Sequence, residues 1–261
     1  MSNFFVTTHI PLPWDIPFPH TLIGVEGYIP KEENSIAASN VISKLLDSET
    51  AFGALRSLIP INSSIEDMDD NATIFTGTYR LFLGKETEKD WLSPVLQENL
   101  IISPTELDSK WKSIIATELP VGIDILIPAP RLLPDTILGQ YSRVHHLDDL
   151  LLATGCAIRA GLLEPLSVPK MLSSNTLIPY GNFASKKEMK FDFNQRLWWC
   201  AQEFYKHHYK PRNGYQRRVI DFVFERITSM ALIQMIINKN LQCASCRNIW
   251  ISNDGNYIPS K

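Results

Sequence analysis

The stretch from Gly122 to Leu151, GIDILIPAPRLLPDTILGQYSRVHHLDDLL, decides how the whole chain is interpreted. Its first part, Ile123–Pro128, is a β-branched apolar run ended by a proline, which predicts a buried strand that stops at a loop. The loop that follows carries Arg131. A ligand site can open at this point, because open α/β sheets bind ligands beyond the carboxyl ends of their strands.

Polar side chains follow the strand at helical spacing. Successive gaps of one, four and four residues make them neighbours on one helix, and they are Gln140, Tyr141, His145 and Asp149. We therefore expect a polar site just past the carboxyl end of the strand. The alternative, which the residue types leave about equally open, is that the histidine and the tyrosine only complete the edge of the core.

The composition describes a globular protein with one large domain, or with one domain and a helical appendage. Of the 261 residues, 44% are hydrophobic and 20% are charged, which is enough for a sizeable core. The net charge of −3 argues against a general nucleic-acid-binding surface, so we expect no nucleic-acid partner. The first residues lack the basic start of a signal peptide, and no apolar run approaches the roughly 20 residues that span a bilayer, so we expect a cytoplasmic protein.

The chain has four cysteines. In a chain of this length they indicate reduced, mostly buried thiols rather than a disulfide framework. Cys243 and Cys246 form a lone C-x-x-C motif. Without a second cysteine pair or a nearby histidine, this motif is a weak indication of either zinc binding or thiol redox chemistry.

Apolar periodicity predicts mixed strands and helices in the first part of the chain and helices in the last part. Expected strands cover residues 3–9, 73–83, 100–104 and 123–128, and residues 21–29 form either a strand or a loop. Expected helices cover residues 36–47, 48–58, 106–117, 147–163, 191–208 and 215–239, while residues 85–99 are helical or irregular. Residues 247–261 are expected to form a peripheral strand or to be poorly ordered.

Residues 61–72 form the most acidic and polar short segment, directly before the strand expected at 73–83. In one interpretation Asp67, Asp69 and Asp70 supply hard oxygen ligands for Mg²⁺ or Mn²⁺. In the other, the segment is a solvated loop, and Tyr79 and Arg80 of the strand face the ligand. We favour the solvated loop, because acidic surface loops are common and the spacing of the aspartates is weakly specific.

Two later segments carry further candidate residues. Residues 179–184 are a short extended stretch that brings the amide of Asn182 close to a ligand or, alternatively, forms an ordinary turn. Near the middle of the helix expected at 215–239, Glu225 and Arg226 form buried ion pairs that position a loop or, alternatively, are solvated charges.

Several segments, in one order, resemble the glycosyltransferase-like proteins of bacterial capsular, exopolysaccharide and O-antigen gene clusters. The matching segments are Asn34–Asn40, Ile74–Phe82, Ile125–Pro128 with Gln140, Tyr141, His145, His146 and Asp149, then Tyr180–Glu188, Tyr215–Arg218 and Phe222–Arg226. The chain departs from the family pattern in several places. Thr78 stands where the family has histidine, Leu81 stands where it has a second arginine, Ser39 replaces a lysine, and Gly181-Asn182-Phe183 replaces Asn-Met-Phe.

The resemblance implies an α/β fold: a single GT-A-like (Rossmann-like) domain over residues 1–240, in which a mixed sheet is flanked by helices and the C-terminal part is helical, followed by a tail at 241–261. It implies a glycosyltransferase that moves a sugar from a nucleotide-sugar donor to a glycan or lipid-linked glycan of a growing surface polysaccharide. Such an enzyme works in the cytoplasm at the inner face of the membrane, with peripheral membrane association left open. The alternative is a non-catalytic relative that binds a sugar nucleotide or glycan as an assembly partner.

The same resemblance suggests roles for individual residues. His145 and Asp149 are the expected catalytic residues, as base toward the acceptor or as contacts to sugar hydroxyls. Arg80, Arg131 and Arg218 are expected to contact phosphate. The full set of expected substrate-binding residues is Tyr79, Arg80, Arg131, Gln140, Tyr141, His146, Asn182, Arg218, Glu225 and Arg226. If a cation takes part, Mn²⁺ or Mg²⁺ on Asp67, Asp69 and Asp70 is expected; a metal-dependent hydrolase using these aspartates is a third hypothesis.

Overall fold

The structure is a computed structural model that describes residues 2–25, 28–38, 57–208 and 219–253. Its strands are β1 (Ser2–Thr8), β2 (Thr21–Gly24), β3 (Ser35–Ala37), β4 (Thr73–Thr78), β5 (Leu81–Glu88), β6 (Leu100–Ile102), β7 (Ile125–Pro128), β8 (Arg131–Leu132), β9 (Thr176–Leu177), β10 (Ala184–Lys186) and β11 (Cys243–Ile251). Its helices are α3 (Leu58–Glu66), α4 (Pro104–Ile114), α5 (Ile137–Val144), α6 (Leu147–Arg159), α7 (Val168–Leu172), α8 (Lys187–His208) and α9 (Val219–Asn238), with a short 3-10 helix at Pro94–Leu96.

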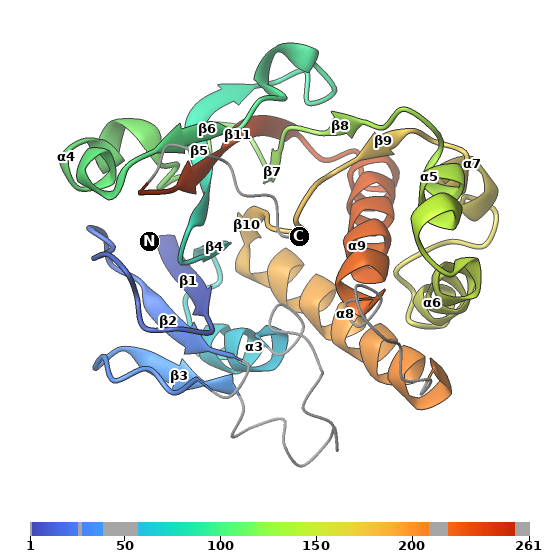
Figure 1. Cartoon of the computed structure of the whole chain (residues 1–261), viewed down its shortest axis with the longest axis horizontal. Coiled ribbons are helices and arrows are strands. Elements are labelled where there is room, and N and C mark those ends of the chain that lie inside the picture. The colour runs from blue at the N-terminus through green and yellow to red at the C-terminus, as the bar shows by residue number, and fades with distance from the viewer. Residues whose placement is uncertain (1, 26–27, 39–56, 209–218, 254–261) are drawn as a thin grey trace.

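Among the described residues, nine strands form one mixed sheet. β3, β2, β1 and β4 lie side by side in parallel, at the lower left of Figure 1. β10 is antiparallel to both β4 and β7, so β4 and β7 point in the same direction. β11 pairs in parallel with β7 and β6 and antiparallel with β5. The carboxyl ends of β1, β2, β4, β7 and β11 therefore share one edge of the sheet, which we call the carboxyl edge.

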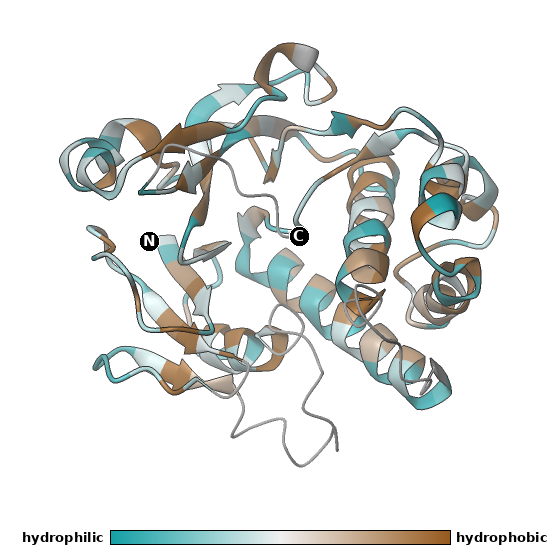
Figure 2. Ribbon diagram, in the orientation of Figure 1, coloured by the Kyte–Doolittle hydropathy of each residue, from teal (hydrophilic) through white to brown (hydrophobic). Residues whose placement is uncertain are grey.

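Both faces of the sheet are covered. Along β1, Phe4 and Val6 point to one face and Phe5 to the other, as the two-residue period of a strand requires. The face with Phe4 packs against α4 and the segment around Phe18. The other face packs against α3 and against the helices from α5 to α9. Figure 2 shows the consequence in the helices, since α8 alternates hydrophobic and hydrophilic residues along its length.

The structure confirms several expected elements. β7 is buried along all four of its residues and ends at Pro128, as the opening stretch predicts. β1, β6, α4, α8 and α9 also lie where the sequence places them, within a few residues. α4 begins at a capping box in which the Ser103 hydroxyl and the Glu106 carboxylate each accept a backbone N–H of the other residue.

Three expectations before residue 100 are wrong. The first two residues of the helix expected at 36–47 belong instead to strand β3, which continues the sheet beyond β2. Ala38 is helical, and the rest of that helix and most of the helix expected at 48–58 lie outside the described residues. The acidic segment starts inside helix α3, because Ile61 and Ile65, one turn apart, both enter the core. The single strand expected at 73–83 is a hairpin, with Tyr79 and Arg80 as the turn between β4 and β5.

Two expectations in the second half are also wrong. The polar residues from Gln140 to Asp149 do not share one helix, because α5 ends at Val144, His145 has an extended backbone and α6 starts at Leu147. The strand expected to be peripheral after residue 246 is part of β11, which lies inside the sheet between β7 and β5. Its residues are nearly all buried, since neighbouring strands cover both of its edges.

The cysteines are buried and free, as the composition predicts. Cys243 and Cys246 are three residues apart on one strand, so their side chains enter the cores on opposite faces of the sheet. The C-x-x-C motif therefore brings no pair of thiols together. Burial raises the pKa of each of these two thiols to about 12.

We predict that the native protein resists thiol reagents. Only a thiolate attacks such reagents, and burial disfavours the thiolate at Cys156, Cys200, Cys243 and Cys246. The native protein is titrated with a chromogenic disulfide at about pH 7.5, below the ordinary pKa of a thiol. No cysteine should be labelled within minutes in buffer, whereas every cysteine should be labelled in denaturant. Rapid labelling of any of them in the native protein would contradict this burial.

Candidate functional site

Two arginines and two aromatic rings form a row at the carboxyl edge. Arg80, in the turn after β4, lies 5.6 Å from the ring centroid of Trp250 near the end of β11. The ring of Tyr180 is 5.5 Å from that of Trp250. Arg131, just after β7, lies 5.0 Å from the Tyr180 centroid and donates a hydrogen bond to the Tyr180 hydroxyl. We call Arg80, Trp250, Tyr180 and Arg131 the cation–aromatic row.

The row combines charge with flat apolar surface. Each arginine is half-buried, and its guanidinium lies against an aromatic ring. The ring replaces water on one face of the guanidinium and restricts the orientation of its planar fork. Guanidinium forks match phosphate oxygens, and aromatic faces accept flat or apolar ligand groups. The carboxyl edge therefore offers positive charge at two points, with rings between them.

The turn before β10 places Tyr180 in this row. Tyr180 and Gly181 both have left-handed backbone angles, with φ of 64° and 67°. Tyrosine rarely adopts this conformation, and here a hydrogen bond from its N–H to Glu225 Oε1, 3.1 Å long, holds it. A side chain at Gly181 would press on Thr228 of α9 at 3.2 Å, so glycine lets the turn lie close to the helix.

A buried network on α9 supports the turn. Glu225 Oε2 accepts a hydrogen bond from Arg226 Nη1 at 2.6 Å, while Arg226 Nη2 donates to Gln140 Oε1 at 3.0 Å. Arg226 Nη1 also donates to the Phe222 carbonyl, and its guanidinium lies 5.8 Å from the Tyr141 ring. Glu225 and Arg226 thus form an ion pair that positions a loop, one of the two roles the sequence left open, although only the arginine side chain is buried.

His145 and Asp149 follow Tyr141 along the chain, and both are buried. The His145 ring stacks on Phe222 with centroids 4.3 Å apart and is 4.8 Å from Tyr141, and its residue is 9% exposed. Asp149, in the first turn of α6, has no exposed surface. Tyr141 is likewise fully buried. The structure thus brings Gln140, Tyr141 and His145 together with Arg226, although not on the single helix that the spacing suggested.

Other predicted residues lie elsewhere. His146 is exposed at the start of α6. Tyr79 is buried beneath Arg80, with its ring against Trp14 and His9. Arg218 lies outside the described residues.

The three aspartates stand at the amino end of β4, whereas Tyr79 and Arg80 follow its carboxyl end. Six residues of strand separate the two places, roughly 20 Å. Asp70 is solvent-facing and pairs with Lys187, which also donates to two carbonyls of the same loop. Among the described residues, no group of three histidine, cysteine, aspartate or glutamate side chains has the arrangement of a metal site. The structure therefore does not bring Asp67, Asp69 and Asp70 to the row.

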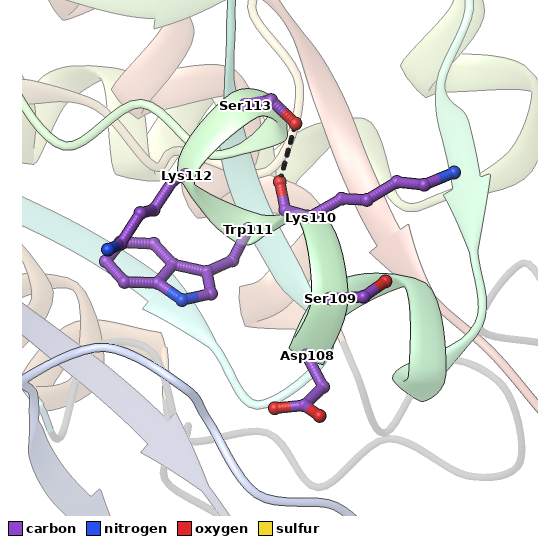
Figure 3. A pocket seen from close by; sticks show the side chains of 6 residues that line it. All are labelled: Asp108, Ser109, Lys110, Trp111, Lys112 and Ser113. Atoms are coloured by element: carbon purple, nitrogen blue, oxygen red, sulfur yellow. Dashed lines mark hydrogen bonds between the residues drawn. The ribbon is translucent and has the colours of Figure 1, made fainter.

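Asn182 lies between the turn and β10 and is 7% exposed. Neither atom of its amide group has a hydrogen-bond partner in the described part of the protein. A surface hollow elsewhere, seen in Figure 3, is lined by consecutive residues of α4, Asp108–Ser113. Because one helix alone forms that hollow, it gathers no convergent polar groups from other elements, and the carboxyl edge is the better candidate site.

Comparison with known proteins bears on the fold. The chain is similar to a solved structure, the apo form of the bifunctional glycosyltransferase WbbM, with a TM-score of 0.70 and 14% sequence identity. The fold is similar to that of a glycosyltransferase. The match covers 99% of this chain and 47% of WbbM, so the chain spans about half the length of that protein. No protein-family model and no curated protein matches the chain.

The likeness to WbbM supports the expected mixed α/β glycosyltransferase-like fold in its coarse form. None of the described helices has the length and apolarity needed to cross a bilayer.

Sequence reasoning missed two members of the row. Trp250 stands in a run, Asn248–Ile251, whose aromatic and β-branched residues could have indicated a buried strand. Tyr180 precedes a glycine, a common turn signal, but nothing in the sequence reveals that its ring reaches Arg131 and Trp250.

We predict that Arg226→Ala destabilises the protein by about 2 kcal/mol, because it leaves the partly buried Glu225 carboxylate and the Gln140 oxygen without their donor. Urea denaturation measures this loss. The control is Arg196→Ala on α8, whose ion pair with Asp192 is solvent-exposed and should contribute about 1 kcal/mol or less. Equal losses in the two variants would show that the network does not stabilise the site.

A second buried cation gives a pH-dependent prediction. Burial holds the pKa of Lys190 on α8 well below its usual range. Between that lowered pKa and about 10.4, the folded protein binds fewer protons than the unfolded chain, so this group makes the free energy of unfolding rise with pH. We predict that the stability of the wild type, relative to Lys190→Met, rises between about pH 8 and pH 10 by up to about 1.4 kcal/mol per pH unit.

The comparison with Lys190→Met separates this lysine from the buried thiols. Burial raises the pKa of the cysteines, which lowers stability as the pH rises above about 8.5, the opposite direction. Both proteins contain the same cysteines, so the effect of the thiols cancels in the difference between their free energies of unfolding. Urea denaturation at several pH values measures this difference. A difference that is independent of pH would mean that Lys190 is charged when folded.

Proposed function

We propose that the chain is a glycosyltransferase that takes a sugar from a nucleotide-sugar donor and transfers it to a glycan or lipid-linked glycan of a bacterial surface polysaccharide. The observation that carries this proposal is the cation–aromatic row at the carboxyl edge, in a fold similar to that of a solved glycosyltransferase. We further propose that the domain is GT-A-like and that it works at the cytoplasmic face of the membrane.

The row suits the chemistry of glycosyl transfer. The leaving group is a nucleotide diphosphate, and negative charge grows on it as the sugar develops oxocarbenium character. Arg80 and Arg131 are fixed by their rings before the ligand arrives, so they stabilise that charge without reorganisation. The faces of Trp250 and Tyr180 give the base or sugar of the donor an apolar surface between the two charges.

The buried network supplies support rather than contact in this proposal. Glu225 and Arg226 fix the Tyr180 turn, and Gln140 ties that pair to α5. His145 retains the proposed role of acceptor base, at the rim of this network with a small exposed fraction. The complete burial of Asp149 fits support of the junction between α5 and α6, where a carboxylate in the first turn of a helix is favourable.

Metal dependence is a separate proposal. Mn²⁺ or Mg²⁺ remains the proposed cation if one takes part, because divalent ions are a common way to neutralise a leaving diphosphate. The distance of the three aspartates from Arg80 along β4 favours phosphate contact through arginine at the carboxyl edge.

We predict that one nucleotide class stabilises the protein against heat. A ligand at about a hundred times its dissociation constant adds about 2.7 kcal/mol of stability, an easily measured shift. The screen uses UDP, GDP, CDP and their sugar conjugates, each with Mn²⁺ and with EDTA. Arg131→Ala and Arg80→Ala should each weaken the active ligand by about tenfold or more, since each removes charge-assisted hydrogen bonds to phosphate.

Arg196→Ala is the matched control, because it removes an exposed arginine of α8 and should leave binding unchanged. Absence of any ligand shift in the wild type would overturn the proposal. Binding without sugar transfer, and without slow hydrolysis of the donor, would favour the non-catalytic relative. This second function is supported by the departures from the family pattern at Thr78 and Leu81, which flank the Tyr79-Arg80 turn.

A further inference from the structure

Lys190 is the most deeply buried lysine among the described residues, with 2% of its surface exposed. Its Nζ donates hydrogen bonds to Thr76 Oγ1 of β4 and to the Phe183 carbonyl, each 2.9 Å long. The same nitrogen lies 3.3 Å from the centroid of the Phe183 ring. No carboxylate of the described residues forms an ion pair with it.

These contacts join two segments of the candidate site. Thr76 lies four residues before Arg80 on β4 and the following turn. The Phe183 carbonyl belongs to the peptide group that follows Asn182 and Phe183, at the start of β10. Thr76 Oγ1 itself donates to the same carbonyl at 3.3 Å, so lysine, threonine and carbonyl form a closed triangle of contacts.

The triangle completes a clamp on the turn that carries the row. At one end, Glu225 holds the N–H of Tyr180 and Arg131 holds its hydroxyl. At the other end, Lys190 holds the Phe183 carbonyl. Between the two ends stands Asn182, whose amide has one oxygen and one NH₂ group, both buried and without partners in the described residues. An unsatisfied buried amide is costly, so its presence at a clamped turn points to a hydrogen-bonding ligand.

We propose that Lys190 is a positioning residue of the donor site, which holds Asn182 in place relative to Arg80 by tying the start of β10 to β4. The ligand group that Asn182 then meets carries both a hydrogen-bond donor and an acceptor, as neighbouring hydroxyls of the donor sugar do. This inference rests on the proposed function for the identity of the ligand. The role of Lys190 in holding the turn stands on the contacts of the ligand-free protein.

The test compares Lys190→Met with Lys187→Met. Methionine has nearly the length of lysine but cannot donate a hydrogen bond. Lys187 lies one turn earlier on α8 and also donates to backbone carbonyls, those of Glu66 and Met68, but at the amino end of β4. It therefore controls for the loss of a lysine that links α8 to a neighbouring segment, here the end of α3 and the loop before β4. Thr76→Val, which removes only the hydroxyl of the triangle, serves if Lys190→Met does not fold.

Hydrogen exchange of the ligand-free proteins gives the first result. Lys190→Met or Thr76→Val should speed exchange of the backbone amides of residues 180–186 by about tenfold, as expected for the loss of one hydrogen bond to a locally opening segment. Lys187→Met should leave these amides unchanged and speed exchange near residues 66–72. Unchanged exchange at 180–186 in both test variants would overturn the positioning role.

Binding of the nucleotide sugar that stabilises the wild type gives the second result. Lys190→Met should weaken the sugar conjugate by about tenfold while leaving the free nucleoside diphosphate nearly unchanged, because Arg80 and Arg131 still hold the phosphates. Asn182→Ala should have the same pattern, and the double variant should lose no more than either single variant. Equal weakening of both ligands, or additive losses, would overturn the link to Asn182. A wild type that binds no nucleotide overturns the proposed function, and hydrogen exchange still decides the role of Lys190.

Discussion

The pairing of the three-residue strand β10 with both β4 and β7 is the constraint on which the site depends. This strand joins the parallel half of the sheet, β1 to β4, to the half that contains β7 and β11. So few residues make few hydrogen bonds of their own, and an isolated strand of this length is not stable. Its position is therefore set by what holds its two ends, which are the Tyr180 turn and the first turns of α8.

Buried polar side chains are the means by which those ends are held. Glu225 on one side and Lys190 on the other bind backbone groups of the segment that leads into β10. The buried Arg226 in turn holds the Glu225 carboxylate. Such groups are costly to bury, and apolar residues of the same size often stabilise a core better. Polar groups add direction, however, since a hydrogen bond fixes one carbonyl or one N–H and an apolar contact does not. A site that must hold two arginines at fixed positions therefore gains more from the defined geometry of hydrogen bonds than from added stability.

The sequence predicts the apolar framework well and the polar geometry poorly. The buried run of β7 and the long helices α8 and α9 follow from local patterns that the structure confirms. The break at His145 does not follow from such a pattern, because the residues on both sides continue the helical period and the Phe222 ring that stacks on His145 comes from another helix. Ile36 and Trp250 were misplaced for a related reason, as both take their conformation from strands distant in sequence. Likewise, the spacing of Gln140, Tyr141 and His145 identified residues that do meet, but the partner that gathers them, Arg226, comes from another helix.

The central place of β11 has a consequence for how the protein is made. β5 and β7 are synthesised more than a hundred residues before β11, the strand that separates and pairs with both of them. Until β11 has left the ribosome, each of these two strands presents an unpaired edge, apolar along β7 and along the first half of β5, and such edges associate readily with other chains. Folding that waits for so distant a partner is slow. A newly made chain therefore depends on chaperones during this interval more than its final stability would suggest.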